Sequence, residues 1–339
     1  MMVEVPLISA QATTCGATGT ISLAGSVNVQ PIATLWAAAY KAQCNRAVTV
    51  EGGGSSTGAL RVCGDTTKGS AVDIGNLARG WKSTEAKVGT NGYTYTCLIG
   101  TKPSVVQVDV AIDALAVVTK LNGAEDLCIK ALGGLTNHQL RWIFSNYTVS
   151  KLKATGWNAA SLPNSDGNDS THLWSELSTK CPKTEIKLSG TDSTLASYTN
   201  FIDAILTDSK NGEGIASSRY KAFAVEANVI TYIKSTASSV AFVGYGLQYN
   251  KNRSVVNAAA IKNSAGSFVL PTSTTIQNGT YNPLSRRIFM NVKTTTLTRT
   301  KAYIQYGMST KGTADVTTAG FIPIPATDRT KMLTRVSNP

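Results

Sequence analysis

The sequence predicts an α/β fold in which helices cover both faces of a sheet. Two observations indicate this: short apolar runs alternate with runs of helical periodicity, and turns of small residues separate them. With 339 residues, the chain is long enough for two domains that each have a core. Its composition, 42% hydrophobic and 15% charged, excludes a disordered tail and a coiled coil.

The first unit of the alternation lies near the start of the chain. A strand is predicted over 20–24 and a turn over 25–30, and Pro31 stands where a first helical residue belongs. Apolar residues then recur at helical spacing at Ile32, Leu35, Trp36, Ala39 and Tyr40. This spacing predicts a helix with one buried face.

Three further units repeat the order. Their predicted strands are 47–51, 71–76 and 184–188. The turns and strand ends that follow are 52–56, Leu77-Ala78-Arg79 and 189–193. Helices are expected from about Thr57 and over the apolar positions Leu195, Tyr198, Ile202 and Ile205. The other predicted elements are strands at 111–120, 239–245 and 287–292, helices at 137–144 and 298–308, and a loop at 162–170.

A membrane-embedded protein is excluded by the hydropathy pattern. The most apolar run, Ser104 to Leu121, carries Asp109, Asp113 and Lys120 and cannot span a bilayer. The net charge of +12 suits attraction of anions, and equally adhesion to anionic surfaces. The basic residues are dispersed and match no nucleic-acid-binding module, so we expect no nucleic-acid partner.

The cysteines indicate an oxidising compartment. There are six, none form a CxxC pair, and only two histidines accompany them, which argues against a zinc site. We expect up to three disulfides and favour Cys128 with Cys181, because both fall in one predicted lobe. The alternative is six buried thiols.

Four N-x-S/T tripeptides, the acceptor pattern for N-glycosylation, point to the same compartment. They begin at Asn146, Asn168, Asn252 and Asn278. The chain starts MMVEVPL without the pattern of a signal peptide, and we interpret this as removal of that peptide from a secreted glycoprotein.

Three of the predicted turns share one chemical feature, a helix N-terminus that follows small residues. Each of three turns is rich in Ser, Thr or Gly and leads into a helix, whose first N–H groups lack intrahelical partners. Several such helix starts at the carboxyl ends of parallel strands predict a site for a compact oxyanion. For Ser55, Ser56 or Ser193 taken singly, the alternative is an ordinary helix cap.

Arg79 is the leading cationic candidate, because a side chain just after a strand can offer its guanidinium fork to an oxyanion. Its alternative role is an exposed or bracing arginine. Neither His138 nor His172 lies in an evident catalytic pattern. No metal ligand cluster and no cofactor motif occurs, so neither is expected.

These segments resemble the phosphate-binding solute-binding proteins of phosphate transporters. Gly25 to Ile32 with Trp36 is similar to the family's G-S-S/T-T-V-x-P segment, and Gly52 to Gly58 to its G-x-G-S-S-x-G segment. Asp73 to Arg79 resembles D-I-G-x-x-S-R, and Gly190 to Ser193 resembles the start of G-T-[DE]-S-G-T. The order and spacing of these motifs together are specific, and the match covers most of the chain.

The resemblance implies a type II periplasmic-binding-protein fold with two α/β lobes that close on phosphate. Lobe one would comprise residues 1–113 plus 288–339, and lobe two residues 114–287. The implied phosphate ligands are Ser26, Val27, Asn28, Ser55 and Arg79 in lobe one, with Thr191, Asp192 and Ser193 in lobe two.

Three positions depart from the family pattern. Ala78 stands in place of Ser or Asp, Thr194-Leu195 in place of Gly-Thr, and Val27 with Asn28 in place of hydroxyl residues. The changes favour a second hypothesis, a structural or adhesive surface protein that has lost its ligand. A phosphate-releasing hydrolase is a third and weaker hypothesis, because no nucleophile–base pair is evident.

The sequence therefore predicts a secreted or cell-surface, non-enzymatic and monomeric phosphate-binding protein. A membrane transporter is a candidate partner. Asp192 is the candidate acceptor for the proton of hydrogen phosphate, a role that would disfavour sulfate. Its alternative role is to turn the chain.

Overall fold

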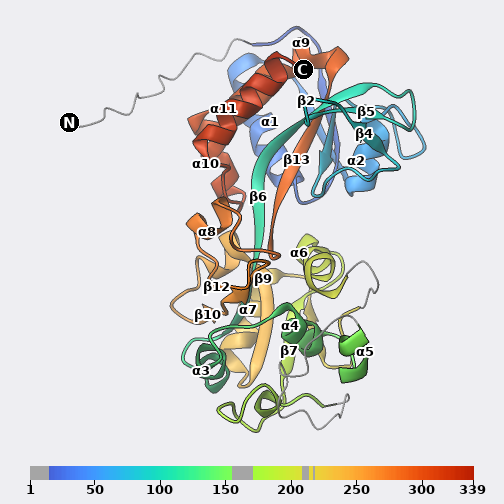
Figure 1. Ribbon diagram of the computed structural model, residues 1–339. Coiled ribbons are helices and arrows are strands. Elements are labelled where there is room, and N and C mark those ends of the chain that lie inside the picture. The colour runs from blue at the N-terminus through green and yellow to red at the C-terminus, as the bar shows by residue number, and fades with distance from the viewer. Residues whose placement is uncertain (1–14, 155–170, 208–213, 217) are drawn as a thin grey trace, which may run out of the picture. The chain divides into compact units, whose positions relative to one another are not determined.

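The computed structural model describes residues 15–154, 171–207, 214–216 and 218–339 (Figure 1). Contacts divide the chain into two compact units. The first consists of residues 1–112, 287–319 and 323–339, and the second of residues 113–286 and 320–322. The chain passes from one unit to the other within β6 (Ser104–Lys120) and β13 (Ser285–Lys293), and again on either side of residues 320–322.

The first unit is built on a mixed sheet. Its strand order is β2 (Val48–Gly53), β1 (Ile21–Gly25), β3 (Ile74–Leu77), β13 and β6. The hairpin of β4 (Ala86–Val88) and β5 (Thr94–Cys97) extends the sheet along β6. Because β1 pairs in parallel with both β2 and β3, the carboxyl ends of these three strands share one edge.

Helices cover both faces of this sheet, as predicted. The crossover through α1 (Gln30–Cys44) and the crossover through α2 (Ser55–Val62) run in opposite directions along the sheet, so right-handed connections place the two helices on opposite faces. Helix α1 packs with α9 (Leu297–Met308) and α10 (Thr310–Thr318), and α9 packs with α11 (Ala326–Ser337).

Three residues of the predicted apolar stripe of α1, Ile32, Trp36 and Tyr40, are buried in this layer, whereas Leu35 and Ala39 are half-buried. Trp36 and Tyr40 are fully buried, and both meet the ring of Tyr303 from α9 edge to face, with centroids 6.1 and 5.7 Å away.

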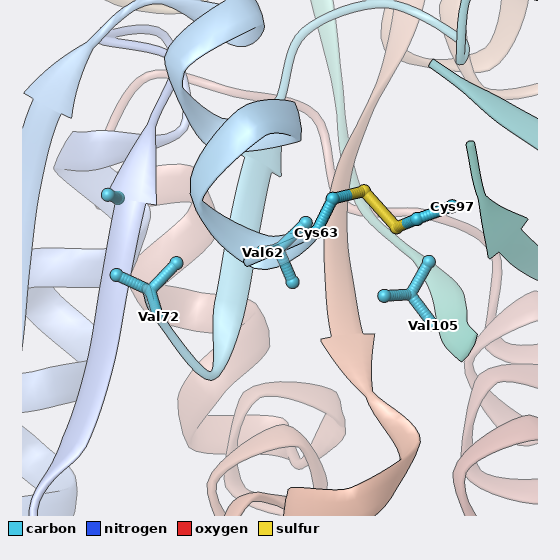
Figure 2. Packing of buried hydrophobic residues seen from close by; sticks show 6 residues of the cluster. Val62, Cys63, Val72, Cys97 and Val105 are labelled. Atoms are coloured by element: carbon cyan, nitrogen blue, oxygen red, sulfur yellow. A yellow bond between two sulfur atoms is a disulfide. The ribbon is translucent and has the colours of Figure 1, made fainter. Parts of the chain in front are cut away.

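All six cysteines are paired. The disulfides join Cys15 to Cys44, Cys63 to Cys97 and Cys128 to Cys181, and the last pairing confirms the prediction. Figure 2 shows the second bridge inside an apolar cluster with Val62, Val72 and Val105.

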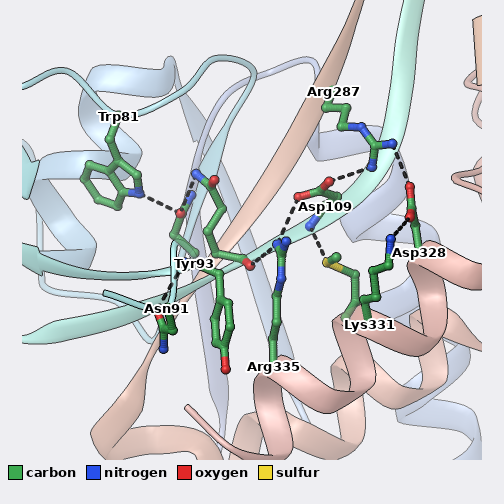
Figure 3. Close-up of polar contacts among 11 residues, drawn as sticks. Trp81, Asn91, Tyr93, Asp109, Arg287, Asp328, Lys331 and Arg335 are labelled. Carbon is green, nitrogen blue, oxygen red and sulfur yellow. Dashed lines mark hydrogen bonds and ion pairs between the residues drawn. The ribbon is translucent and has the colours of Figure 1, made fainter. Parts of the chain in front are cut away.

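A network of charges fixes the last helix to the first unit (Figure 3). Arg287 of β13 binds Asp109 of β6 at 2.6 Å and Asp328 of α11 at 2.7 Å. Arg335 of α11 lies 3.4 Å from the same Asp109 and donates to the Gln107 carbonyl at 3.1 Å. One arginine thus neutralises two carboxylates that neighbouring elements have brought together.

The second unit has its own sheet, with strand order β6, β9 (Ser239–Gly244), β7 (Lys187–Thr191) and β8 (Tyr220–Phe223). Strand β7 pairs in parallel with β8 and β9, while β9 and β10 (Val256–Ala258) run antiparallel to β6. A separate ribbon joins β11 (Ile261–Lys262) to β12 (Phe268–Val269).

The helices of the second unit fill the connections between its strands. The longer ones are α3 (Ala124–Ala131), α4 (Asn137–Phe144), α7 (Glu226–Ser235) and α6 (Ala196–Phe201), which continues as η3 (Ile202–Leu206). The short ones are α5 (Val149–Ala154), η2 (Trp174–Glu176), η4 (Tyr245–Tyr249) and α8 (Ser273–Gln277). Stacked rings of Phe201 and Phe242, 4.2 Å apart, mark its core.

The bounds of two predicted strands differ from those in the structure. The strand predicted at 184–188 is displaced to Lys187–Thr191, and the predicted turn begins only after Thr191. Gly190 explains the error: a Cβ at this position would collide with the Tyr220 hydroxyl and the Phe242 ring, so this glycine serves packing inside a strand. The strand predicted at 111–120 is the second half of β6, and the predicted loop at 162–170 lies outside the described residues.

None of the helices in the described ranges combines the length and apolar character needed to cross a membrane.

Candidate oxyanion-binding site

Three turns of the first unit meet at the shared edge of β1, β2 and β3, and hydrogen bonds join them. The Ser26 amide after β1 donates to the Asn76 carbonyl of β3 at 2.8 Å, and the Gly54 amide after β2 donates to the Gly25 carbonyl at 2.9 Å. The Ala78 amide after β3 donates to the Ser55 hydroxyl at 3.0 Å. The segments that carry Ser26, Ser55 and Arg79 are therefore held together at one place.

The first turn leads into α1. Ser26 and Asn28 are buried, and the Asn28 amide donates to the Ser26 hydroxyl oxygen at 3.2 Å. The Val27 side chain is 46% exposed, so only its backbone lies among these buried groups. The Ser26 carbonyl accepts from the amides of Val29 and Gln30, which starts the helix.

The second turn presents a helix start. Gly54 has φ +88°, a conformation that favours glycine, and its carbonyl accepts the first bond of α2, from the Gly58 amide at 3.1 Å. The amides of Ser55, Ser56 and Thr57 precede this bond and have no partner within the helix. The Ser55 hydroxyl accepts from Ala78 and retains its own hydrogen for donation.

Arg79 lies beside this helix start. One nitrogen of its guanidinium donates to the Ser56 hydroxyl at 3.2 Å, and its fork binds both oxygens of Glu85 at 2.7 and 2.8 Å. Burial alone would raise the pKa of the Glu85 carboxyl, but hydrogen bonds from Arg79 and the Lys82 amide outweigh it and hold that pKa below its ordinary value. Glu85 therefore stays ionised and keeps Arg79 against α2.

Sequence reasoning missed Glu85, Ser56 as a partner of Arg79, and Asn76. Asn76 is fully buried at the end of β3, and neither side-chain atom has a hydrogen-bond partner among the described residues. Such a group is costly to bury without a partner. The available signal was an Asn near the end of a predicted strand, three residues before Arg79.

In the second unit, the three predicted residues follow one another at the end of β7. Thr191 is fully buried, Asp192 is half-buried and Ser193 is exposed. The Asp192 Oδ1 accepts from the Thr194 amide at 2.9 Å and from its hydroxyl at 2.5 Å. Asp192 thus closes the turn with Oδ1, as its alternative role required, and Thr194 is one of the residues that departs from the family pattern.

The Thr191 hydroxyl belongs to a chain of hydrogen bonds. It lies 3.0 Å from the Ser197 hydroxyl at the start of α6, and Ser197 in turn bonds the carboxylate of Glu226 at the start of α7. Glu226 also accepts from the Gly244 amide at 2.8 Å. While Glu226 is ionised, Ser197 donates to it, and Thr191 donates to Ser197 because each hydroxyl has one hydrogen.

Glu226 was not identified from the sequence. Burial raises the pKa of its carboxyl, and the negative charge of Asp113 raises it further, while the bonds from Gly244 and Ser197 lower it less. The end of β7 therefore combines hydroxyl groups with a carboxylate that resists ionisation.

No group of three or more His, Cys, Asp or Glu residues within the described ranges is arranged to hold a metal ion.

A family model described as a PBP superfamily domain matches residues 10–311. This chain therefore belongs to the PBP superfamily.

Among curated relatives, the phosphate-binding protein PstS of Pseudomonas aeruginosa is 28% identical over 319 residues, which are 92% of this chain and 85% of the relative. Protein SphX of Synechococcus elongatus is 24% identical over 308 residues, 89% of this chain and 77% of the relative.

Solved structures show the same fold. A possible phosphate-binding protein from Planctomyces limnophilus superposes with a TM-score of 0.67 at 21% identity, covering 95% of this chain and 98% of its own. An ABC-type phosphate transport receptor from Vibrio cholerae gives a TM-score of 0.60 at 19% identity, covering 91% of this chain and 100% of its own.

Proposed function

We propose that this protein binds inorganic phosphate reversibly and carries out no reaction of its own. The observation that carries the proposal is the shared strand edge of the first unit. There, the free amides at the start of α2, the Ser55 hydroxyl and the Arg79 guanidinium gather within one hydrogen-bonded set of turns. Backbone amides at a helix start, hydroxyls and a guanidinium are the donors that suit a phosphate.

The proposed ligands are those expected from the sequence, with roles adjusted to their contacts. Ser26, Ser55 and Arg79 donate from side chains, and Val27 and Asn28 contribute backbone. In the second unit, the Ser193 hydroxyl has no hydrogen-bond partner among the described residues and is an available donor.

Thr191 and Asp192 are proposed as acceptors. The Thr191 hydrogen is spent on Ser197 while Glu226 is ionised, so its oxygen can only accept. Asp192 uses Oδ1 within its turn, which leaves Oδ2 to accept the O–H of hydrogen phosphate. Sulfate has no such hydrogen near neutral pH and would meet an unpaired carboxylate.

The relatives support a role in uptake. The Pseudomonas relative is named a phosphate-binding protein and the Vibrio structure a phosphate transport receptor. We infer that this chain is an exported, monomeric receptor that passes phosphate to a membrane transporter. Three disulfides support an oxidising compartment outside the cytosol.

Equilibrium dialysis with radiolabelled phosphate tests the roles in the first unit. Ser55→Ala removes one hydrogen bond to a charged ligand, worth about 1.5–3 kcal/mol, and should weaken phosphate binding roughly tenfold or more. Glu85→Gln releases one side of the Arg79 fork and should also weaken binding. Glu51→Gln, which loses an ion pair of the exposed Glu51 with Arg61, is the matched control and should bind like the parent.

Equal affinity in the parent and in Ser55→Ala would contradict the site. If the parent itself does not bind phosphate, the proposed function is wrong and the surface-protein hypothesis is favoured. The Thr194 hydroxyl is consistent with that hypothesis, because it donates its hydrogen to Asp192 within the turn.

A further inference from the structure

None of the four N-x-S/T tripeptides is among the proposed phosphate ligands, and the structure distinguishes between the three tripeptides that lie in its described residues. At Asn252, the side-chain Nδ2 donates to the Gln248 carbonyl at 2.8 Å, and the middle residue Arg253 is held over the rings of Tyr245 and Tyr249. The nitrogen that would carry a sugar is therefore already bonded, and the tripeptide is fixed to its surroundings.

At Asn146, the asparagine itself is exposed but its neighbour is not. The middle residue Tyr147 is 1% exposed, and its hydroxyl donates to the Leu206 carbonyl at 3.5 Å. This tripeptide is anchored in the core of the second unit. The tripeptide at Asn168 lies outside the described residues.

Asn278 differs on every count. It caps the end of α8, and all three residues Asn278, Gly279 and Thr280 are exposed. Gly279 has φ +76°, and no atom would lie within 4 Å of a Cβ placed on it, so the turn stands in open space. Within the described residues, Nδ2 of Asn278 has no hydrogen-bond partner.

The hydroxyl of the tripeptide is already in contact with the amide. The Oδ1 of Asn278 accepts from the Thr280 amide at 3.0 Å and from the Thr280 hydroxyl at 2.7 Å. Both contacts are made by Oδ1, so the turn is held without using Nδ2. The hydroxyl residue at the third position is what defines an acceptor tripeptide for N-glycosylation.

We propose that Asn278 carries an N-linked glycan. The co-reactant is an oligosaccharide linked to a polyprenyl diphosphate, supplied by an oligosaccharyltransferase. Nδ2 forms a bond to the anomeric carbon, the bond from that carbon to the diphosphate oxygen breaks with its electron pair, and Nδ2 loses one proton. The lipid diphosphate is the leaving group, and no oxidant or reductant is needed.

The folded chain accommodates this modification because the glycan would project from an exposed turn. The supporting contacts of the turn use other atoms: the Asn263 side chain donates to the Thr280 carbonyl at 3.1 Å, and the Asn282 side chain donates to the Gly279 carbonyl at 3.0 Å. Neither contact involves the Asn278 side chain, so glycosylation leaves them intact.

The test is expression of the full chain through the secretory pathway of a yeast, followed by intact-mass measurement before and after peptide N-glycosidase in heavy-oxygen water. The expected result is a glycan mass that the enzyme removes, with the heavy-oxygen label on residue 278. Asn278→Gln and Thr280→Ala should each lose that mass, and Thr280→Ser should keep it.

Asn252→Gln is the matched control and should keep the parental glycan mass. Circular dichroism verifies that each variant is folded. An unchanged glycan mass in Asn278→Gln would overturn the proposal, as would a parent chain that carries no glycan at all. Loss of the glycan in Thr280→Ala, with retention in Thr280→Ser, would support it because only the hydroxyl is shared.

Discussion

The protein should become less stable in mild acid because of a buried histidine in its second unit. His172 is fully buried and stacks on Trp142, with ring centroids 4.0 Å apart and planes 6° from parallel. Burial lowers the pKa of this imidazole from 6.5 to about 3, and the positive charge of Arg219 contributes to the shift. Neither ring nitrogen makes a hydrogen bond of normal geometry to a described residue.

The sign of the effect follows from the two pKa values. The unfolded chain binds a proton near pH 6.5 and the folded chain only near 3, so the stabilisation is complete above pH 6.5 and is lost as the pH falls through that window. Each pH unit below 6.5 lowers the free energy of unfolding by about 1.4 kcal/mol. At pH 5 the loss from this one group is therefore about 2 kcal/mol.

Urea unfolding followed by circular dichroism at pH 7.5 and pH 5 measures this loss. His172→Phe keeps an aromatic ring against Trp142 but cannot bind a proton. Between the two pH values, the parent should lose about 2 kcal/mol more than the variant. An identical pH dependence in parent and variant would refute the reasoning, because His172 would then titrate alike in the folded and unfolded chain.

Three further predictions concern stability and are measured by the same unfolding assay. Gly190→Ala should destabilise the protein by about 3 kcal/mol because the added methyl group has no room, whereas Gly214→Ala, with nothing within 4 Å, should change it little. Arg287→Ala leaves two carboxylates without their shared cation and should cost about 2 kcal/mol, and an unchanged midpoint would show that the network contributes nothing. Replacing Cys128 and Cys181 with alanine opens a loop with a sequence separation of 53 and should cost about 4 kcal/mol; reduction of the parent, which opens all three bridges, must cost at least as much.

The periodicity of apolar residues in the sequence predicted much of the fold. The helical spacing of Ile32, Trp36 and Tyr40 predicted a buried face, and all three are fully buried. The end of β7 was misplaced because Gly190 has two meanings in sequence, a turn former or a residue without a side chain beneath an aromatic ring. Only the tertiary packing decides between them.

Candidate residues could be predicted where neighbouring positions in the sequence form a turn. Contacts between residues that only tertiary folding brings together could not be predicted. Ser55 was predicted as a candidate ligand because it lies in the small-residue turn that leads into α2. The pairing of Arg79 with Glu85 was not predicted, because it depends on how the intervening turn folds back. The link from Thr191 through Ser197 to Glu226 joins the end of β7 to the starts of α6 and α7. It depends on parallel pairing of β7 with its neighbours.

We infer that this protein binds phosphate and rejects sulfate, with Arg79 as a phosphate ligand. Calorimetric titration of phosphate-free protein with each anion, on the parent and on Arg79→Ala, tests it most directly. We predict saturable heat with phosphate, none with sulfate, and loss of the phosphate signal in the variant. Flat titrations of the parent with both anions would contradict the claim, and equal binding of phosphate by Arg79→Ala would contradict the site.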